Sequence, residues 1–520
     1  MSHRDSILYV VLVRVKGLIP KVGSSTILGR PVSADICQTF RQRVYHDGLN
    51  ETHRRYCAMP SEVITDKSLQ RELADSIIRM VPLDEIRILL ACGAKVNEPV
   101  TQGLRPLHYA IWQRNLEATR LLLVRGCDIN ATDDCGYSAL HLSAEHGYTE
   151  LVKLLLESGA AVDYRPDTGE EFPRTTLCDE PLRLAIRNKH YAVARLLLEH
   201  GADPNKRYFF GAEINLVSDP EYLELLLTFG ANPDSRDRAG LTPLMKAARQ
   251  RKGIESVLLL ISYGADVNAA TDARSDYRTV MHYAVLGGCT EVVNLLIKQG
   301  ARVNYDPDYN KPSPLDLAIL KGDVDMVKML IAAGAKVNSS SSVIGTPLHV
   351  ACSDGISQRK ELVKILLESG ADPNLKVYNE EDGAQLRPAL AELLAGDLQP
   401  CGDTVRLLLR YGARVIMKTQ FRDPDGILNH LQNVTTEESQ YIFYLLLEAA
   451  EAFDLCMIKR NNILQPKQKQ TLIDRAKTPI SLLAQARIFL RRFFGPTLIH
   501  AIKTFEIPKT LQRYLLFEYS

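Results

Sequence analysis

Residues 133–162, DDCGYSALHLSAEHGYTELVKLLLESGAAV, contain the unit from which most of this chain is built. The sequence predicts a short helix that begins at Ala139 and ends at Gly147, followed by a leucine-rich helix over positions 151–156. The second helix carries too many apolar residues for a single buried stripe. Gly159 follows it, at the point where a left-handed residue closes a helix and glycine carries no steric cost. A two-helix hairpin of this composition must bury both faces, so it needs a neighbour on each side.

The same closing glycine recurs along the chain. Glycines followed by Ala or Cys come after leucine-rich segments at intervals of 29 to 42 residues, at positions 93, 126, 159, 201, 230, 264, 300, 334, 370 and 412. About twenty residues before most of them, Ser or Thr can cap a helix and Pro takes its first position, where no N–H is needed. These openings are Arg105-Pro106-Leu107-His108, Ser138-Ala139-Leu140-His141, Thr242-Pro243-Leu244-Met245, Ser313-Pro314-Leu315-Asp316 and Thr346-Pro347-Leu348-His349.

This pattern resembles the ankyrin repeat, whose signature is a T-P-L-H-x-A opening at a period near 33 residues. The resemblance implies an all-α fold, an ankyrin-repeat solenoid of about ten to eleven hairpins over residues 61–450, with degenerate hairpins as end caps. Two long intervals contain polar insertions, at residues 165–179 and 376–386. The first is either part of a binding edge or a tolerated surface loop, and the sequence leaves both interpretations open.

Composition excludes several classes of protein. The net charge is +1, from 63 basic and 62 acidic residues, so no field of the whole chain favours nucleic acid or an anionic membrane. The ten cysteines are scattered singly without a C-x-x-C pair, as in reduced intracellular proteins. No apolar run approaches the roughly 18 residues of a membrane span. We therefore expect a cytoplasmic protein, with the nucleus as a second location, that binds neither nucleic acid nor membrane.

The two ends of the chain do not follow the repeat. Residues 1–60 are expected to form an irregular leader, because the apolar run 7–15 is short, contains Arg14 and lacks the features of a signal peptide. Residues 451–478 are polar and contain Pro466, so they are predicted to form a linker. Residues 479–520 then form a separate terminal module.

Three short helices are predicted in this module. Ser481 can cap the first helix, which ends at Gly495-Pro496, and Pro508 separates the second helix from the third. Leu482, Ala486 and Leu490 are predicted on one face of the first helix. Three short helices make a very small core, so a partner is expected to cover their apolar surface.

The module resembles a SOCS box, the suppressor-of-cytokine-signalling box. In that family an S/T-L-x-x-x-C-R segment binds the elongin B–elongin C pair, and a downstream L-P-L-P-x-x-L-x-x-Y-L segment recruits cullin-five. The resemblance implies elongin contacts at Leu482, Ala486, Arg487 and Leu490, with Ala486 in place of the family's Cys. It implies cullin contacts at Ile507, Pro508, Leu511, Tyr514 and Leu515, with Phe505 and Glu506 departing from the first Leu-Pro.

An ankyrin array followed by a SOCS box is the order of the ankyrin-repeat and SOCS-box family. The resemblance implies a substrate-recognition adaptor of an elongin B/C–cullin-five ubiquitin ligase with its RING protein, in which partners carry out catalysis. An ankyrin scaffold or inhibitor without a ligase role is the alternative. A terminal segment like an F-box is a third possibility, which the I-P-x-x-L-x-x-Y-L ending disfavours.

No catalytic constellation, metal site or cofactor motif is found in the sequence. His108, His141, His282 and His349 recur with the period of the fold, so they are predicted to be structural and not metal ligands. The protein substrate cannot be read from a fold-level resemblance. Residues at the tips of the predicted hairpins are the candidates to contact it, namely Asp134, Tyr137, Arg238 and Leu241.

Overall fold

The computed structural model describes residues 69–164, 179–305, 311–379, 383–396, 400–421, 423–434, 440–505 and 507–518. The predicted leader and nearly all of the insertion 165–179 lie outside these residues, as does Glu506. The described chain falls into two compact units, one ending at Arg238 and the other beginning at Ala239. Within the described ranges, no helix is both long and apolar enough to span a membrane.

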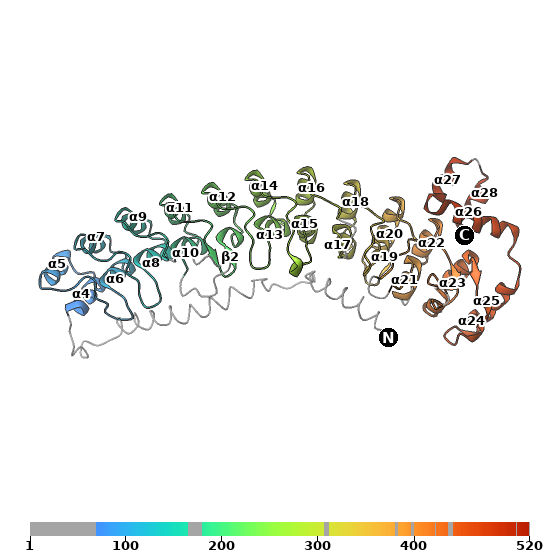
Figure 1. Ribbon diagram of the computed structural model, residues 1–520, viewed down its shortest axis with the longest axis horizontal. Coiled ribbons are helices and arrows are strands. Elements are labelled where there is room, and N and C mark those ends of the chain that lie inside the picture. The colour runs from blue at the N-terminus through green and yellow to red at the C-terminus, as the bar shows by residue number, and fades with distance from the viewer. Residues whose placement is uncertain are drawn as a thin grey trace. The chain divides into compact units, whose positions relative to one another are not determined.

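The unit that ends at Arg238 is a stack of helical hairpins. In Figure 1, α4, α6, α8 and α10 form one row and α5, α7, α9 and α11 a second row, with neighbours in each row in contact. A small antiparallel β-hairpin, β1–β2, follows α11. The elements are α4 (Leu69–Ile78), α5 (Leu83–Ala91), α6 (Pro106–Trp112), α7 (Leu116–Val124), α8 (Ala139–His146), α9 (Thr149–Glu157), α10 (Pro181–Arg187), α11 (Tyr191–Glu199), β1 (Arg207–Tyr208), β2 (Gly211–Ala212), η2 (Glu213–Asn215) and α12 (Pro220–Thr228).

The unit that begins at Ala239 continues the pattern through α22 and then becomes irregular. Its repeat elements are α13 (Pro243–Arg249), α14 (Ile254–Ser262), η3 (Ala273–Ser275), α15 (Val280–Gly287), α16 (Thr290–Lys298), α17 (Pro314–Lys321), α18 (Val324–Ala332), α19 (Pro347–Cys352), α20 (Arg359–Glu368), α21 (Ala389–Gly396) and α22 (Gly402–Arg410). Its terminal elements are β3 (Ile416–Met417), η4 (Leu428–Asn433), α23 (Gln440–Ala449), β4 (Ala452–Phe453), α24 (Leu455–Arg460), α25 (Pro466–Lys477), α26 (Leu482–Phe494), η5 (Gly495–Thr497), α27 (Leu498–Thr504) and α28 (Lys509–Leu515).

The predicted helix openings have the expected capping geometry. At α8, Ser138 Oγ accepts from the His141 N–H at 3.4 Å, and His141 Nδ1 accepts from the Ser138 N–H at 3.2 Å. Burial lowers the pKa of His282 to about 3 and that of His349 to about 4, so both imidazoles are neutral at ordinary pH. The prediction that the periodic histidines are structural is confirmed at these positions.

Asparagine side chains join consecutive repeats, a feature that the sequence analysis missed. Asn304 donates from Nδ2 to the Gly334 carbonyl at 2.8 Å, and its Oδ1 accepts from the Lys336 N–H at 2.8 Å. The same pair of bonds links Asn374 to Gly412 and Arg414. The carbonyls of six closing glycines accept such a bond from the preceding repeat, namely those of Gly126, Gly230, Gly300, Gly334, Gly370 and Gly412.

In the repeat with the 29-residue interval, no α-helix stands at the position of the first helix, where the sequence near Ala212 to Val217 lacks a good helix opening. Only the short turn η2 stands there, and Glu213 in it is 5% exposed. Arg183 occupies the position in α10 that His141 holds in α8, and its Nη1 lies 3.7 Å from Glu213 Oε2. Where α8 has an imidazole, α10 therefore has a half-buried arginine, which faces the buried carboxyl group of the irregular repeat.

The stretch predicted as a linker is helical, which corrects the prediction for residues 451–478. It contains α24 and α25, which contact each other. Leu472 of α25 is fully buried, and Gln468 donates from Nε2 to the Val434 carbonyl at 2.7 Å. These contacts pack the polar helix α25 against the chain that precedes it.

Candidate functional site

The last three helices, α26, α27 and α28, form a small module with its own core, as predicted. Leu498, Ile502, Leu515 and Leu516 are the buried residues of that core. Ser481 caps α26, since its Oγ accepts from the Ala484 N–H at 3.3 Å, and the helix ends before Gly495. The predicted cap and the predicted breaks at Gly495 and Pro508 are therefore confirmed.

One face of α26 carries large apolar side chains in solvent. Leu482 is 82% exposed, Phe489 is 65% exposed and Phe493 is 71% exposed, with Ala486 exposed between them. An α-helix turns about 100° per residue, so these four positions lie within about 40° of one line. We call Leu482, Ala486, Phe489 and Phe493 the α26 stripe. The rings of Phe489 and Phe493 stack at 6.1 Å between centroids.

Leu490 does not belong to this stripe, contrary to the prediction. A residue eight positions after Leu482 is rotated by about 80° from it, and Leu490 packs instead against the core of the module. The prediction from the i, i+4, i+8 spacing therefore includes Leu490 wrongly and leaves out Phe489 and Phe493. A strict 3.6-residue period would have found both phenylalanines.

Arg487 faces away from the stripe and into the protein, which corrects its predicted elongin contact. Its side chain is 2% exposed, and its two terminal nitrogens donate to Glu448 Oε1 at 2.8 Å and to the Glu448 carbonyl at 2.7 Å. The guanidinium also lies over the rings of Tyr514 and Phe517, at 4.2 and 4.5 Å from their centroids. Arg487 therefore holds α26 against the end of α23 and against the tail of the module.

Arg491, one turn further along, anchors the same face of α26 to the last regular repeat. Nη1 donates to the Leu409 carbonyl at 2.6 Å, and Nη2 donates to the Ala413 carbonyl at 2.9 Å. The Leu409 carbonyl lies in the last turn of α22 and the Ala413 carbonyl just beyond that helix end, where a cation is favoured. Burial lowers the pKa of Arg491 to about 10, which still leaves it charged at neutral pH.

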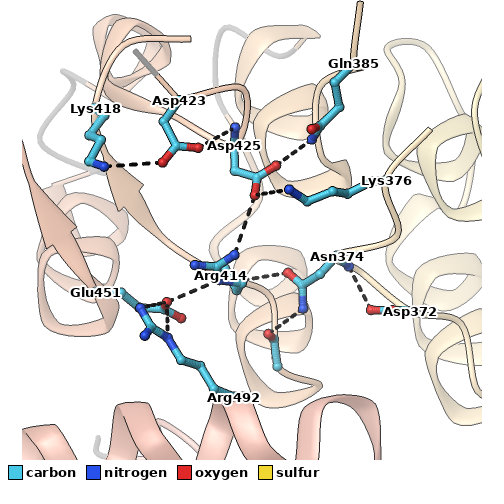
Figure 2. A network of polar contacts seen from close by, with 11 residues as sticks. Asp372, Asn374, Lys376, Gln385, Arg414, Lys418, Asp423, Asp425, Glu451 and Arg492 are labelled. Atoms are coloured by element: carbon cyan, nitrogen blue, oxygen red, sulfur yellow. Dashed lines mark hydrogen bonds and ion pairs between the residues drawn. The ribbon is translucent and has the colours of Figure 1, made fainter. Parts of the chain in front are cut away.

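Figure 2 shows a polar network that extends this anchoring. Arg492 of α26 lies 2.8 Å from Glu451, whose side chain is 3% exposed, and Arg414 donates from Nε to the same carboxylate at 3.2 Å. Arg414 also lies 3.6 Å from Asp425, which accepts from Gln385 Nε2 at 2.6 Å. The network therefore runs from the predicted loop insertion 376–386 to the terminal module.

The predicted cullin residues divide into buried and accessible ones. Leu515 is 3% exposed in the core, and Ile507 and Leu511 pack against that core, so Leu515 is not available to a partner. This corrects the prediction for Leu515. Tyr514 lies under the Arg487 guanidinium. Pro508 is exposed, and Phe505 is 53% exposed with its ring 5.9 Å from that of Phe494.

The predicted substrate residues are also placed differently from one another. Tyr137 is 4% exposed with its ring 5.5 Å from that of His141, so it is part of the core, which corrects its prediction as a contact residue. Asp134 and Arg238 are exposed, and Leu241 is half-buried. Asp134 and Arg238 remain accessible candidates.

In the described ranges, no group of three or more His, Cys, Asp and Glu side chains could hold a metal ion. The cysteines found there are all free thiols. Burial raises the pKa of the Cys127 thiol to about 11 and that of Cys352 to about 12, so neither is a thiolate at neutral pH.

Comparison with known families assigns both parts of the chain. A family model described as ankyrin repeats matches residues 122–208, 255–341 and 306–377, and a second ankyrin model matches residues 89–142. A model described as the SOCS box matches residues 478–516, which include α26, α27 and α28. The chain therefore belongs to the ankyrin-repeat and SOCS-box proteins, with the helical solenoid and terminal module that the sequence predicted.

Particular relatives carry the same combination in their names. Ankyrin repeat and SOCS box protein 16 of Homo sapiens is 33% identical over 230 residues, which are 43% of this chain and 48% of that protein. Ankyrin repeat and SOCS box protein 6 of Homo sapiens is 28% identical over 231 residues, which are 38% of this chain and 53% of that protein. The chain thus spans about half the length of these two relatives. The ankyrin repeat domain of human ASB11 aligns with 45% of this chain and 98% of its own, at a TM-score of 0.34 and 20% identity.

Proposed function

We propose that this chain is the substrate-recognition subunit of an elongin B/C–cullin-five ubiquitin ligase. The α26 stripe is the observation that carries the proposal. Leu482, Phe489 and Phe493 are large, apolar and exposed on one line of a helix whose other face is fixed by buried arginines. A helix that presents such a line fits an apolar groove in a partner.

Burial of the α26 stripe against a partner is favourable in free energy. Full burial of a Leu or Phe side chain is worth about 1.5–3 kcal/mol, and the stripe offers three such side chains. In the proposed complex, elongin C covers the stripe, while the cullin contacts Phe505 and Pro508 at the other end of the module. Both of these residues are exposed.

The chain then acts by position, and its partners carry out the chemistry. The ankyrin array holds a protein substrate, and the module holds the ligase, so lysines of the substrate stay close to the charged ubiquitin carrier. The buried contacts of Arg487 and Arg491 support this role, because they fix the module to the repeat that precedes it. We expect the complex in the cytoplasm, with the nucleus as a second location.

Co-purification with elongin C from cells tests the proposal. Leu482→Asp places a charge on the α26 stripe and is expected to remove elongin C and the cullin together. Val124→Asp is the matched control, because Val124 is also an apolar helix residue and is 83% exposed in the other unit. Retention of elongin C by the Leu482→Asp variant would contradict the proposal and favour an ankyrin scaffold without a ligase role.

A further inference from the structure

Arg414, just after α22, lies at the centre of the polar network in Figure 2. Its Nε donates to Glu451 Oε2 at 3.2 Å, and its Nη1 lies 3.6 Å from Oδ2 of Asp425. The backbone N–H of Arg414 donates to Asn374 Oδ1 at 2.9 Å, which fixes the position of the residue against the preceding repeat. Arg414 therefore joins two carboxylates that come from different parts of the chain.

Asp425, the first of these carboxylates, contacts both arms of the insertion that precedes α21. Gln385 donates from Nε2 to Asp425 Oδ1 at 2.6 Å, and Lys376 Nζ lies 3.8 Å from Asp425 Oδ2. We call residues 376–379 and 383–386 the insertion hairpin. Because its two arms contact one carboxylate, the order of the hairpin depends on the position of that carboxylate.

The insertion hairpin lies in the connection between two repeats, from α20 to α21. Insertions at such connections map to loops on one face of a repeat array, which is often the binding face. Tyr378 bridges across the hairpin to Gln385, and its side chain is 55% exposed. An exposed tyrosine on an ordered loop suits the binding of a protein partner, because aromatic side chains are common anchors at interfaces.

Glu451, the second carboxylate, connects Arg414 to the terminal module. Its side chain is 3% exposed, and it accepts from Arg492 Nε of α26 at 2.8 Å. The parallel pair β3–β4 holds it beside Arg414, because the Glu451 N–H donates to the Val415 carbonyl at 2.9 Å. Arg492 precedes Phe493 of the α26 stripe directly. The network therefore reaches the helix that carries the proposed elongin-binding surface.

Positive and negative groups alternate along this path, in the order Lys376, Asp425, Arg414, Glu451 and Arg492. Each carboxylate lies between two cations, and Arg414 contacts both carboxylates. Members of one ion-pair network are energetically coupled, because a shift of one group changes the field and the geometry at the next. Loss of the Arg414 guanidinium would leave the hairpin half and the module half without their shared cation.

We infer that Arg414 is a positioning residue that couples the terminal module to the insertion hairpin, so that the elongin pair bound to α26 stabilises the hairpin. A bound partner reduces the motion of α26, and Arg492 then holds Glu451 and Arg414 in place. Asp425 passes this order to both arms of the hairpin. The inference rests on the proposed function, and adds that assembly of the ligase orders part of the substrate surface. By linkage, a substrate that orders the hairpin strengthens elongin binding.

Amide hydrogen exchange of the full chain, with and without saturating elongin B–elongin C, tests the inference. The readout is exchange at the Asn379 and Leu386 amides, whose hydrogen bonds join the two arms of the hairpin. In wild type we expect the elongin pair to slow this exchange about threefold or more. In Arg414→Gln we expect less than about a 1.5-fold change. Arg513→Gln, at an exposed position of α28, is the matched control and is expected to show the slowing of wild type.

Two further variants separate positioning from a general loss of structure. Asp425→Asn removes the charge on the hairpin side and keeps the Glu451 contacts, so it is expected to abolish the slowing as Arg414→Gln does. Arg414→Lys keeps the charge but loses the fork of the guanidinium, so about half of the slowing is expected to remain. Thermal melts establish that each variant is folded, and calorimetric titration measures its binding of the elongin pair.

Equal slowing in wild type and Arg414→Gln would overturn the inference, as would exchange at the hairpin that is unchanged when elongin saturates the wild type. An equal loss of slowing in Arg513→Gln would overturn it as well, because any lost positive charge would then suffice. These results would leave the proposed function in place, since elongin binding is measured separately. Failure of the wild type to bind the elongin pair would instead overturn the proposed function together with the inference.

Discussion

Helices α16 and α26 are both amphipathic, but they bury opposite kinds of side chain. In α16, Val292, Val293 and Leu296 are buried while Glu291 and Lys298 face solvent. In α26, Arg487 and Arg491 are buried, whereas Leu482, Phe489 and Phe493 face solvent. The apolar face of the repeat helix α16 is therefore buried within the chain itself. In α26 the arginine face packs inside the chain and the apolar face is exposed. We therefore expect α26 to have two interfaces, one inside the chain and one with a partner.

A substitution on the inward face of α26 is expected to have the largest effect on the free energy of unfolding. Arg491→Met keeps most of the side-chain volume but removes the donor to both carbonyls, of which the Leu409 carbonyl keeps its bond from the Gly412 N–H and the Ala413 carbonyl loses its side-chain donor. A lost hydrogen bond from a charged donor costs about 1.5–3 kcal/mol and a buried carbonyl left unsatisfied about 1–3 kcal/mol, so we expect a loss of about 3–5 kcal/mol in the free energy of unfolding. Thermal or urea unfolding of the full chain measures this loss. Arg513→Met, at an exposed position of α28, is the control and is expected to change stability by less than about 0.5 kcal/mol.

Alanine substitutions at two closing glycines distinguish the cost of backbone strain from the cost of contact with the module. Gly334 and Gly412 have φ values of +87° and +93°, so alanine is strained at both. An added Cβ meets nothing within 4 Å at Gly334, but at Gly412 it would lie 2.9 Å from the Gly495 carbonyl oxygen. We expect Gly334→Ala to cost about 1–2 kcal/mol and Gly412→Ala about 1 kcal/mol more, because it also pushes on the module.

Equal losses in unfolding free energy for these two glycine variants would argue against close packing between the module and the last repeat. Unfolding followed in parallel by amide hydrogen exchange adds a second readout. Gly412→Ala is expected to increase exchange in α26, whereas Gly334→Ala is expected to leave α26 unchanged.

The irregular repeat, unlike the regular ones, is expected to make the free energy of unfolding depend on pH. Burial raises the pKa of Glu213 from 4.5 to about 7, so the folded chain binds a proton there more tightly than the unfolded chain. The resulting stability is fully present below pH 4.5 and is lost as the pH rises through about 7. Glu213→Gln imitates the protonated form, so it is expected to stabilise the chain at pH 8 by about 2 kcal/mol and to have little effect near pH 4.5.

Urea unfolding of Glu213→Gln and wild type between pH 4.5 and pH 8 measures this difference. Glu221→Gln, at an exposed position in α12, is the control and is expected to show no such dependence. A constant difference between Glu213→Gln and wild type across this pH range would mean that Arg183 keeps Glu213 ionised throughout.

The regular repeats could be predicted from the sequence because their signals are local. A capping hydroxyl, a proline at the first helical position and a closing glycine each act within a few residues, as the capping of α8 shows. The periodic histidines could be predicted as structural for the same reason. The asparagine bonds between repeats join residues about thirty positions apart, so no local pattern in the sequence predicts them.

The terminal module was predicted as a family resemblance, but its side-chain orientations were not. Arg487 and Arg491 are buried because carbonyls and carboxylates from α22 and α23 meet them, and this depends on tertiary contacts. Leu490 was assigned to the exposed line because eight positions were treated as two full turns. Helix α25 is predicted as a linker because most of its residues are polar, although Leu472 and Gln468 are buried in it.

Titration calorimetry of the elongin B–elongin C pair into Phe489→Ala tests the outward face of α26 most directly. Phe489 is 65% exposed in the isolated chain, so the account predicts an unchanged melting temperature together with an affinity for the pair that is about tenfold to thirtyfold weaker than wild type. Leu490→Ala, one residue further on and packed in the core of the module, should instead lower the melting temperature. An unchanged affinity in Phe489→Ala would contradict the claim that this face is the partner-binding surface.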